Sequence, residues 1–292
     1  MSAPVAPAKA GAQFPQIANF LPRDLFRGKT VFVTGGGSGI NLGIARNFAA
    51  LGAHIAICGR TQERLDTAAV ELGAANAHAS GKVLAVAADV RDYAAVEHAF
   101  KRTADEVGAI DILVSGAAGN FVCPAEGLSP NGFKTVIDID LQGSFHASRA
   151  AFEQLKATRG FLLFIGAGQA FVPQAYQLHV AAAKAGIDIM MKNLAIEWGR
   201  HGIRTATIVP GPIAGTEGMR RLTPPGFEEV KKAVIPLGRM GSVDDIGHAA
   251  VFLASPLAGY ITGAVLCVDG GNSLVGSAMW NQAVQKMDLT RR

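Results

Sequence analysis

The chain has 292 residues, of which 49% are hydrophobic and 17% charged, and 27 Lys and Arg against 23 Asp and Glu give a net charge of +4. This composition excludes an intrinsically disordered chain and is sufficient for a large hydrophobic core. The mildly basic balance contains no run of Lys or Arg, so it predicts no nucleic-acid partner but is compatible with phosphorylated ligands.

The elements begin after an Ala- and Pro-rich segment, residues 1–27, which we expect to be an extended arm. From residue 28, short β-branched apolar runs alternate with amphipathic helical stretches. Seven runs are the expected strands: Thr30–Thr34, His54–Cys58, Lys82–Ala87, Asp111–Ser115, Gly160–Ile165, Arg204–Val209 and Ala264–Val268. Such apolar strands separated by helices predict an α/β fold, a single-domain doubly wound parallel sheet of about seven strands with helices on both faces.

The expected domain covers residues 28–275 and is followed by a tail, residues 276–292. One stretch, about residues 213–236, interrupts the alternation with Gly, Pro and charged residues. A long insertion of this kind usually covers a site or is mobile, and we expect it to cover the substrate.

The compartment predicted from the sequence is the cytoplasm. The three cysteines, Cys58, Cys123 and Cys267, are far apart and have no metal-ligand spacing, which favours a reducing environment. No apolar run reaches the length of about 18 residues needed to cross a bilayer, so no membrane partner is expected. The first residues lack the apolar region of a secretory signal, and the last four, Leu-Thr-Arg-Arg, are not a peroxisomal Ser-Lys-Leu address.

The first expected strand runs into a glycine-rich turn that precedes a helix. The turn reads Thr34-Gly35-Gly36-Gly37-Ser38-Gly39-Ile40-Asn41. Glycines allow the backbone to approach a pyrophosphate, and the free N–H groups of a helix start complement its charge. Such a turn can be a plain tight connection, but its place in a βαβ unit favours nucleotide binding through Gly35, Ser38, Gly39 and Ile40.

The second expected strand ends in Cys58-Gly59-Arg60, with no carboxylate before Glu63. An acidic residue here, about 20 residues after the turn, would accept a hydrogen bond from a free ribose 2′-hydroxyl. A guanidinium instead suits a 2′-phosphate. Arg60 therefore favours NADP(H) over NAD(H), unless it is only a solvated loop residue.

These motifs together resemble the short-chain dehydrogenase/reductase family, whose turn reads Thr-Gly-x-x-x-Gly-x-Gly, with Asn41 here replacing the last glycine. Three further segments match the family's adenine-binding pair, its Asn-Asn-Ala-Gly segment and the segment that packs on the nicotinamide carboxamide: Asp89-Val90, Ser115-Gly116-Ala117-Ala118-Gly119 and Pro210-Gly211-Pro212-Ile213. The resemblance covers about Gly28 to Ser273. It implies a Rossmann fold, a nicotinamide cofactor and a homotetramer joined through the helices at Phe133–Lys156 and Val180–Gly199.

The catalytic pair usual in this family is incomplete. Lys184 matches the lysine of the family's Tyr-x-x-x-Lys motif, which binds the nicotinamide ribose, but Val180 stands where the tyrosine would be. The serine that usually polarises a carbonyl is also missing near Ile165–Gly168. Ordinary ketone or alcohol chemistry is therefore not expected.

One branch of the family, the 2,4-dienoyl-CoA reductases, transfers hydride without that tyrosine. Several segments resemble its peroxisomal type: Ala117–Pro124, Phe133–Asp140, Leu194–Gly199, Pro210–Gly218 and His179. The chemistry fits, because a dienoyl thioester accepts hydride at its distal carbon and then needs charge stabilisation at the thioester oxygen and a proton on carbon. The resemblance implies Asp140 as the acid, alone or through water, with a structural role as the alternative.

Four residues are candidates for substrate binding. Asn120 and Phe121 follow the nicotinamide loop, His179 precedes Lys184 by five residues, and Arg220 lies in the insertion, where it could meet the phosphates of coenzyme A. A packed histidine and a solvated arginine are the alternatives for the last two. The predicted substrate is an acyl-CoA, reduced as a 2,4-dienoyl-CoA in unsaturated fatty acid degradation. Another reductase of an enoyl or hydroxyacyl thioester, and a catalytically silent nucleotide-binding scaffold, remain alternatives.

Overall fold

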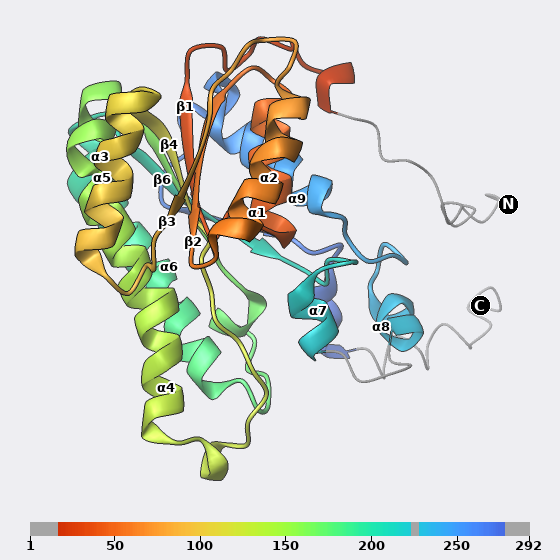
Figure 1. Ribbon diagram of the computed structural model, residues 1–292. Coiled ribbons are helices and arrows are strands. Elements are labelled where there is room, and N and C mark those ends of the chain that lie inside the picture. Colours follow the sequence, from red (N-terminus) through yellow and green to blue (C-terminus); the bar gives the residue numbers. More distant parts are fainter. Residues whose placement is uncertain (1–16, 223–227, 278–292) are drawn as a thin grey trace, which may run out of the picture.

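The computed structural model describes residues 17–222 and 228–277, which form a parallel sheet covered by helices on both faces (Figure 1). The seven strands are β1 (Thr30–Thr34), β2 (His54–Gly59), β3 (Val83–Ala87), β4 (Ile110–Ser115), β5 (Phe161–Ile165), β6 (Arg204–Pro210) and β7 (Ala264–Val268). All neighbouring pairs are parallel. Each predicted strand is confirmed to within one residue at either end, although the edge strands β3 and β7 are less buried than the five strands between them.

Six longer helices form the two outer layers. They are α1 (Gly39–Ala49), α2 (Gln62–Ala75), α3 (Tyr93–Glu106), α5 (Gly143–Thr158), α6 (Leu178–Gly199) and α9 (Val243–Ala254). Helices α1, α2 and α9 cover one face of the sheet, and α3, α5 and α6 cover the other (Figure 1). Three shorter helices are α4 (Pro130–Val136), α7 (Glu217–Leu222) and α8 (Glu228–Val234).

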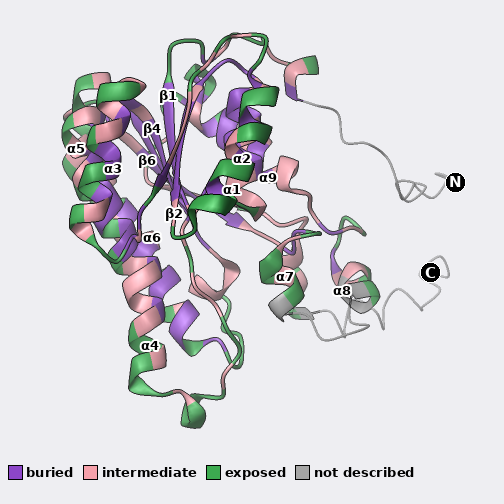
Figure 2. Cartoon of the chain, viewed as in Figure 1, coloured by how far each residue is buried: buried purple, intermediate pink, exposed green. Residues whose placement is uncertain are grey.

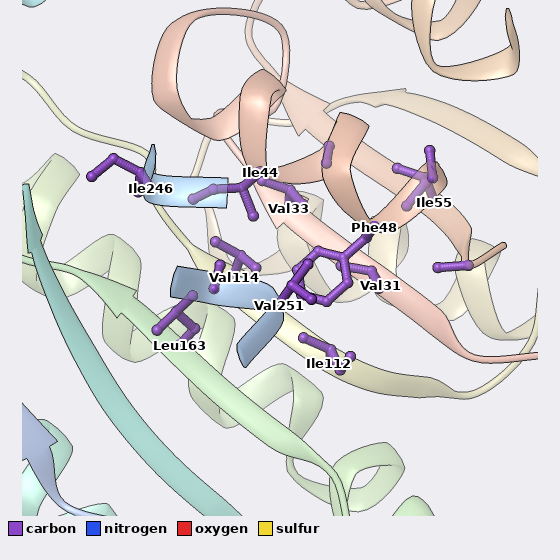
Figure 3. Packing of buried hydrophobic residues seen from close by; sticks show 14 of the residues in the cluster. Val31, Val33, Ile44, Phe48, Ile55, Ile112, Val114, Leu163, Ile246 and Val251 are labelled. Atoms are coloured by element: carbon purple, nitrogen blue, oxygen red, sulfur yellow. The ribbon is translucent and has the colours of Figure 1, made fainter. Parts of the chain in front are cut away.

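The core divides into two layers because alternate strand residues face opposite sides. From β1, Val31 and Val33 point toward Phe48 of α1 and Val251 of α9, as Figure 3 shows. Phe32 faces the other way and packs on Phe100 of α3, with ring centroids 4.2 Å apart. Figure 2 shows the buried strands between the two helical layers. Truncation of Phe48 to alanine would cost about 3–5 kcal/mol.

The strand order β3-β2-β1-β4-β5-β6-β7 positions the site. The chain builds outward from β1 to β3 and then crosses back to β4, so the connections leave the adjacent strands β1 and β4 in opposite directions. Thr34 and Ser115 are register partners at the carboxyl ends of these two strands. Ligands of doubly wound sheets bind at this switch point.

Parts of the predicted arm, insertion and tail lie within the described residues. In the arm, Ile17 and Phe26 are buried against the core. In the insertion, Ile213 forms an isolated bridge with Gly241, and α7 and α8 follow. The predictions for residues 1–16, 223–227 and 278–292 lie outside the described residues.

Candidate functional site

A cleft of 760 Å³ opens at the carboxyl ends of the strands. Its volume is in the range of small-molecule and cofactor sites. The structure brings to it every residue predicted to bind the cofactor: Gly35, Ser38, Gly39, Ile40, Arg60, Asp89, Val90, Gly116, Ala117, Lys184, Pro210, Gly211 and Ile213. These residues come from the ends of five strands or the segments after them and, for Lys184, from helix α6, and the fold collects them on one surface.

The glycine turn after β1 has the shape of a phosphate cradle. Gly35 and Gly39 have φ angles of +67° and +59°, which glycine adopts without strain. A Cβ atom on Gly36 would lie 2.6 Å from Cγ2 of Ile57, so no side chain fits there. The first N–H groups of α1 have no intrahelical acceptor, which leaves them to an anion. The residues present therefore fit a dinucleotide pyrophosphate.

At the end of β2, the exposed side chain of Arg60 lies on the rim of the cleft. Over the described ranges, no carboxylate is within ion-pair distance of its guanidinium. Arg64, one turn into α2, lines the same end, and its Cγ would lie 3.4 Å from a Cβ on Gly37. Arg64 was not predicted as a site residue from the sequence, because it lies inside α2 and not at a strand end. Two guanidinium groups thus flank the adenosine end.

Asp89, which follows β3, is already engaged within the protein. Nη2 of Arg91 lies 2.6 Å from Oδ2 of Asp89. Hydrogen bonds from Arg91, with a smaller contribution from the charge of Arg60, lower the pKa of Asp89 against the effect of partial burial. The carboxylate is therefore ionised and fixed in place at neutral pH.

The charged centre of the site is a buried pair. Nζ of Lys184 lies 3.2 Å from Oδ2 of Asp140, and the two side chains are 7% and 1% exposed. This is an ion-pair contact outside hydrogen-bond geometry, since Oδ2 has no well-directed donor. Lys184 donates a hydrogen bond of 3.0 Å to the carbonyl of Ile165, and Asp140 Oδ1 accepts one of 2.7 Å from the N–H of Gly119.

Asp140 lies on η3 (Ile137–Gln142), a π-helical turn between α4 and α5. Such turns are rare and often occur at functional sites. Lys184 lines the cleft, whereas Asp140 lies behind it and is not exposed to it. Asp140 can therefore act on a ligand only through Lys184 or a bridging water.

Val180, one helical turn before Lys184, packs in a small apolar cluster with Val136 and Ala183. Its side chain is almost fully buried and is not part of the cleft lining. The cleft wall near β5 is formed by Gly166, Ala167 and Gly168, none of which carries a polar side chain. The hydroxyl groups of ordinary carbonyl reduction are thus missing from this wall.

The predicted substrate residues fall into two groups. Asn120 lines the cleft, and its Oδ1 atom is buried without a hydrogen-bond partner. Phe121 and His179 do not line the cleft; their rings stack with centroids 4.3 Å apart, and Nε2 of His179 lies 3.1 Å from the carbonyl of Phe121. Arg220 on α7 is exposed, pairs with Glu217, and also lies outside the cleft lining.

Gln177, which the sequence analysis did not single out, is part of the same cluster. Its Nε2 donates a hydrogen bond of 2.8 Å to the carbonyl of Phe121, the carbonyl that His179 also contacts. Cys123 N–H donates to the carbonyl of Tyr176, 3.1 Å away. The start of α6 therefore holds the 120–123 loop in place, which favours a positioning role for His179 over direct substrate contact.

Other site chemistries find no support over residues 17–222 and 228–277. There, no cluster of three or more His, Cys, Asp or Glu could hold a metal ion, and no helix is long and apolar enough to span a membrane. The three cysteines are all free thiols.

Comparison with known proteins gives a consistent result. Residues 35–273 match the family model described as enoyl-(acyl carrier protein) reductase. The chain is 47% identical over 249 residues to the peroxisomal 2,4-dienoyl-CoA reductase of Saccharomyces cerevisiae, covering 85% of each chain. It is 45% identical over 250 residues to the protein of that name from Pongo abelii, again covering 85% of each. Both names specify a (3E)-enoyl-CoA product.

Among solved structures, a short chain dehydrogenase from Bacillus anthracis superposes with a TM-score of 0.75 at 39% sequence identity. The match covers 84% of this chain and 96% of the other. The similarity therefore extends over the cleft and both helical layers.

Proposed function

The chain belongs to the short-chain dehydrogenase/reductase family, and on that premise we propose that it is an NADPH-dependent 2,4-dienoyl-CoA reductase of unsaturated fatty acid degradation. The observation that carries the proposal is the buried pair of Lys184 with Asp140, beside a cleft whose wall at Gly166, Ala167 and Gly168 carries no proton-donating side chain. Similarity to relatives named 2,4-dienoyl-CoA reductases supports the same substrate.

The proposed cofactor is NADP(H), held with its pyrophosphate on the glycine turn and its 2′-phosphate at Arg60. The exposed guanidinium of Arg60, without a carboxylate partner over the described ranges, supports this preference. Lys184 lines the cleft and would bind the nicotinamide ribose. The reduced nicotinamide supplies a hydride when it is bound.

The proposed proton source is Asp140, acting through a water held at Lys184. Asp140 must first take up a proton in place of its ion pair with Lys184, and since it lies behind Lys184 and is not exposed to the cleft, we propose that this proton passes to a ligand beside Nζ. The ammonium group also lowers the energy of negative charge that develops near it. Together the two residues would supply the proton that the missing tyrosine supplies in related enzymes.

The proposed substrate is a coenzyme A thioester. Asn120 lines the cleft, and the NH₂ group of its amide can donate a hydrogen bond to the thioester oxygen. Arg220 would meet the coenzyme A phosphates at the cleft mouth if its pairing with Glu217 exchanges for a phosphate. Both roles predict changes in KM when these residues are replaced.

The proposed assembly is a homotetramer. Ile189 and Ile196 on α6 are 59% and 80% exposed, and Phe145 on α5 is 53% exposed. Apolar side chains on neighbouring helices gain free energy when a second copy covers them. Light scattering coupled to size exclusion tests this with a mass of four chains expected.

The compartment remains a prediction. The sequence predicts the cytoplasm, whereas two relatives carry the word peroxisomal in their names. Immunofluorescence microscopy of the untagged protein distinguishes the two compartments.

Product analysis tests the proposed reaction. Hydride addition at C5 of a 2,4-dienoyl thioester is followed by protonation at C2, which gives the (3E)-enoyl product, or at C4, which gives the (2E)-enoyl product. We expect the (3E) product, and proton NMR of the reaction mixture identifies it. A 3-hydroxyacyl product from a 3-ketoacyl thioester, with the dienoyl thioester unchanged, would support another family activity instead.

A further inference from the structure

Asn41 lies between the two loops that form the walls of the cofactor cleft. Its Nδ2 atom donates a hydrogen bond of 2.8 Å to the carbonyl of Gly116, on the loop after β4. The same atom lies 3.3 Å from the carbonyl of Gly35, on the glycine turn after β1. Since both neighbours are carbonyl oxygens, the amide can only face them with its NH₂ group.

The packing around this amide leaves no room for other side chains. A Cβ atom on Gly116 would lie 2.1 Å from Oδ1 of Asn41, and the three atoms nearest to it all belong to Asn41. A Cβ on Gly35 would lie 3.0 Å from Nδ2 of Asn41 and 3.0 Å from Cα of Ala117. The amide of Asn41 thus fills the space over both glycines.

The β4 loop is also held from its other side. Oγ1 of Thr34, at the end of β1, accepts hydrogen bonds from the N–H groups of Gly116 and Ala117 at 3.0 and 3.2 Å. Thr34 and Asn41 therefore bind the N–H and the carbonyl of Gly116 respectively. Thr34 fixes the base of the loop, and Asn41 fixes the separation of the loop from the glycine turn.

We propose that Asn41 is a positioning residue for the cofactor: by joining Gly35 to Gly116 it sets the width of the cleft where the dinucleotide passes from its adenosine half to its nicotinamide half. Gly35, Asn41, Gly116 and Ala117 all line the cleft, so a change in this contact is felt directly by the ligand. The inference rests on the proposed function in that a nicotinamide dinucleotide occupies the cleft.

The proposal predicts different effects on two ligands, one that fills only the adenosine end of the cleft and one that fills the whole cleft. Adenosine 2′,5′-bisphosphate occupies only the end near Arg60, whereas NADPH also needs the space between the two loops. Replacement Asn41→Ala removes both hydrogen bonds and introduces a good helix former at the start of α1. It is expected to weaken NADPH binding about tenfold, the effect of about 1.4 kcal/mol, and to leave binding of the bisphosphate unchanged.

Replacement of the neighbouring glycine provides the matched control. Gly116→Ala places a Cβ against the Asn41 amide, so the amide must move. We expect this displacement to weaken NADPH binding more than tenfold. In the double variant with Asn41→Ala the obstructing atoms are gone, so Gly116→Ala should add only a small further loss. This non-additivity requires that the two residues act on NADPH through their mutual contact.

Titration calorimetry of both ligands with the wild type and the three variants decides the matter. The proposal is overturned if Asn41→Ala binds NADPH as well as the wild type, if it loses both ligands equally, or if the two substitutions are additive. Should the wild type bind NADH more tightly, the same titrations are made with NADH and AMP. A wild type that binds neither dinucleotide overturns the proposed function, which is a different result.

Discussion

Nζ of Lys184 lies 3.2 Å from Oδ2 of Asp140, with both side chains almost fully removed from water. Two opposite charges in such surroundings stabilise one another, while each alone would carry a large desolvation cost. Only Lys184 reaches the cleft. Lys184 therefore connects the buried carboxylate of Asp140 to the cleft.

The first prediction separates the roles of the two residues. Asp140→Ala is expected to lower kcat by about 10²–10⁴-fold with little change in NADPH affinity, because Asp140 does not line the cleft and Lys184 keeps its hydrogen bond to the carbonyl of Ile165. Lys184→Ala is expected to lower both kcat and NADPH affinity, because it removes a charged contact to the ribose. Steady-state kinetics and calorimetric titration measure the two quantities.

Two further variants serve as controls for this prediction. Asp140→Asn keeps an oxygen that can accept from the N–H of Gly119 but cannot give a proton, so it should be as slow as the alanine variant. His179→Ala loosens the 120–123 loop and is expected to change KM by only a few-fold. Near-normal kcat in both Asp140 variants would reject Asp140 as the acid, and loss of turnover in His179→Ala alone would move that role to His179.

The second prediction concerns substrates that the protein does not reduce. Val180, four residues before Lys184, packs in an apolar cluster and carries no group that could protonate a carbonyl oxygen. We therefore expect no significant reduction of acetoacetyl-CoA. Turnover near the enzyme median of about 10 per second would show that another group protonates the oxygen.

The third prediction concerns cofactor choice. We expect NADPH to bind more tightly than NADH, because the guanidinium of Arg60 can pair with the 2′-phosphate. Arg60→Ala should remove most of the difference, about 10- to 100-fold in Kd, without weakening NADH. The same affinities are measured for Arg64→Ala, which removes the other guanidinium group at this end of the cleft. Equal affinities of the wild type for the two cofactors would contradict the assignment.

The fourth prediction concerns stability and pH. Burial raises the pKa of Asp245, but the guanidinium of Arg239 and hydrogen bonds from Ser242 outweigh it and lower the pKa from 3.8 to about 2. Asp245 also caps α9 by accepting from the N–H of Ser242 at 2.7 Å. Because the unfolded carboxyl binds a proton more readily, its stabilising effect is complete above about pH 4 and disappears as the pH falls toward 2.

Asp245→Asn is the variant that tests this effect. Near neutral pH it should lower the free energy of unfolding by about 1–2 kcal/mol, the lower part of that range reflecting partial solvent screening. Urea unfolding of both proteins at several pH values shows whether the difference shrinks between pH 4 and pH 2. A difference that stays constant over this interval would contradict the ionic origin.

The sequence predicted the sheet well because apolar β-branched runs such as Thr30–Thr34 leave little choice of structure. The predicted cofactor residues that follow strand ends line the cleft, because the fold brings these ends together, whereas Phe121, His179 and Arg220 do not line it. It could not predict that Asp140 lies behind Lys184, because no pattern of residues in the sequence marks the π-helical turn that places Asp140 there. The contact of Gln177 with Phe121 was missed for a similar reason: it joins two loops that are distant in sequence.

The central claim is tested most directly by mixing purified protein with NADPH and a 2,4-dienoyl-CoA and following both absorbances. We predict loss of the dienoyl absorbance, one molecule for each NADPH oxidised, with the rate falling in Asp140→Ala as described above. NADPH that stays unoxidised while the dienoyl absorbance is constant, in a protein shown by titration to bind NADPH, would contradict the proposed reaction.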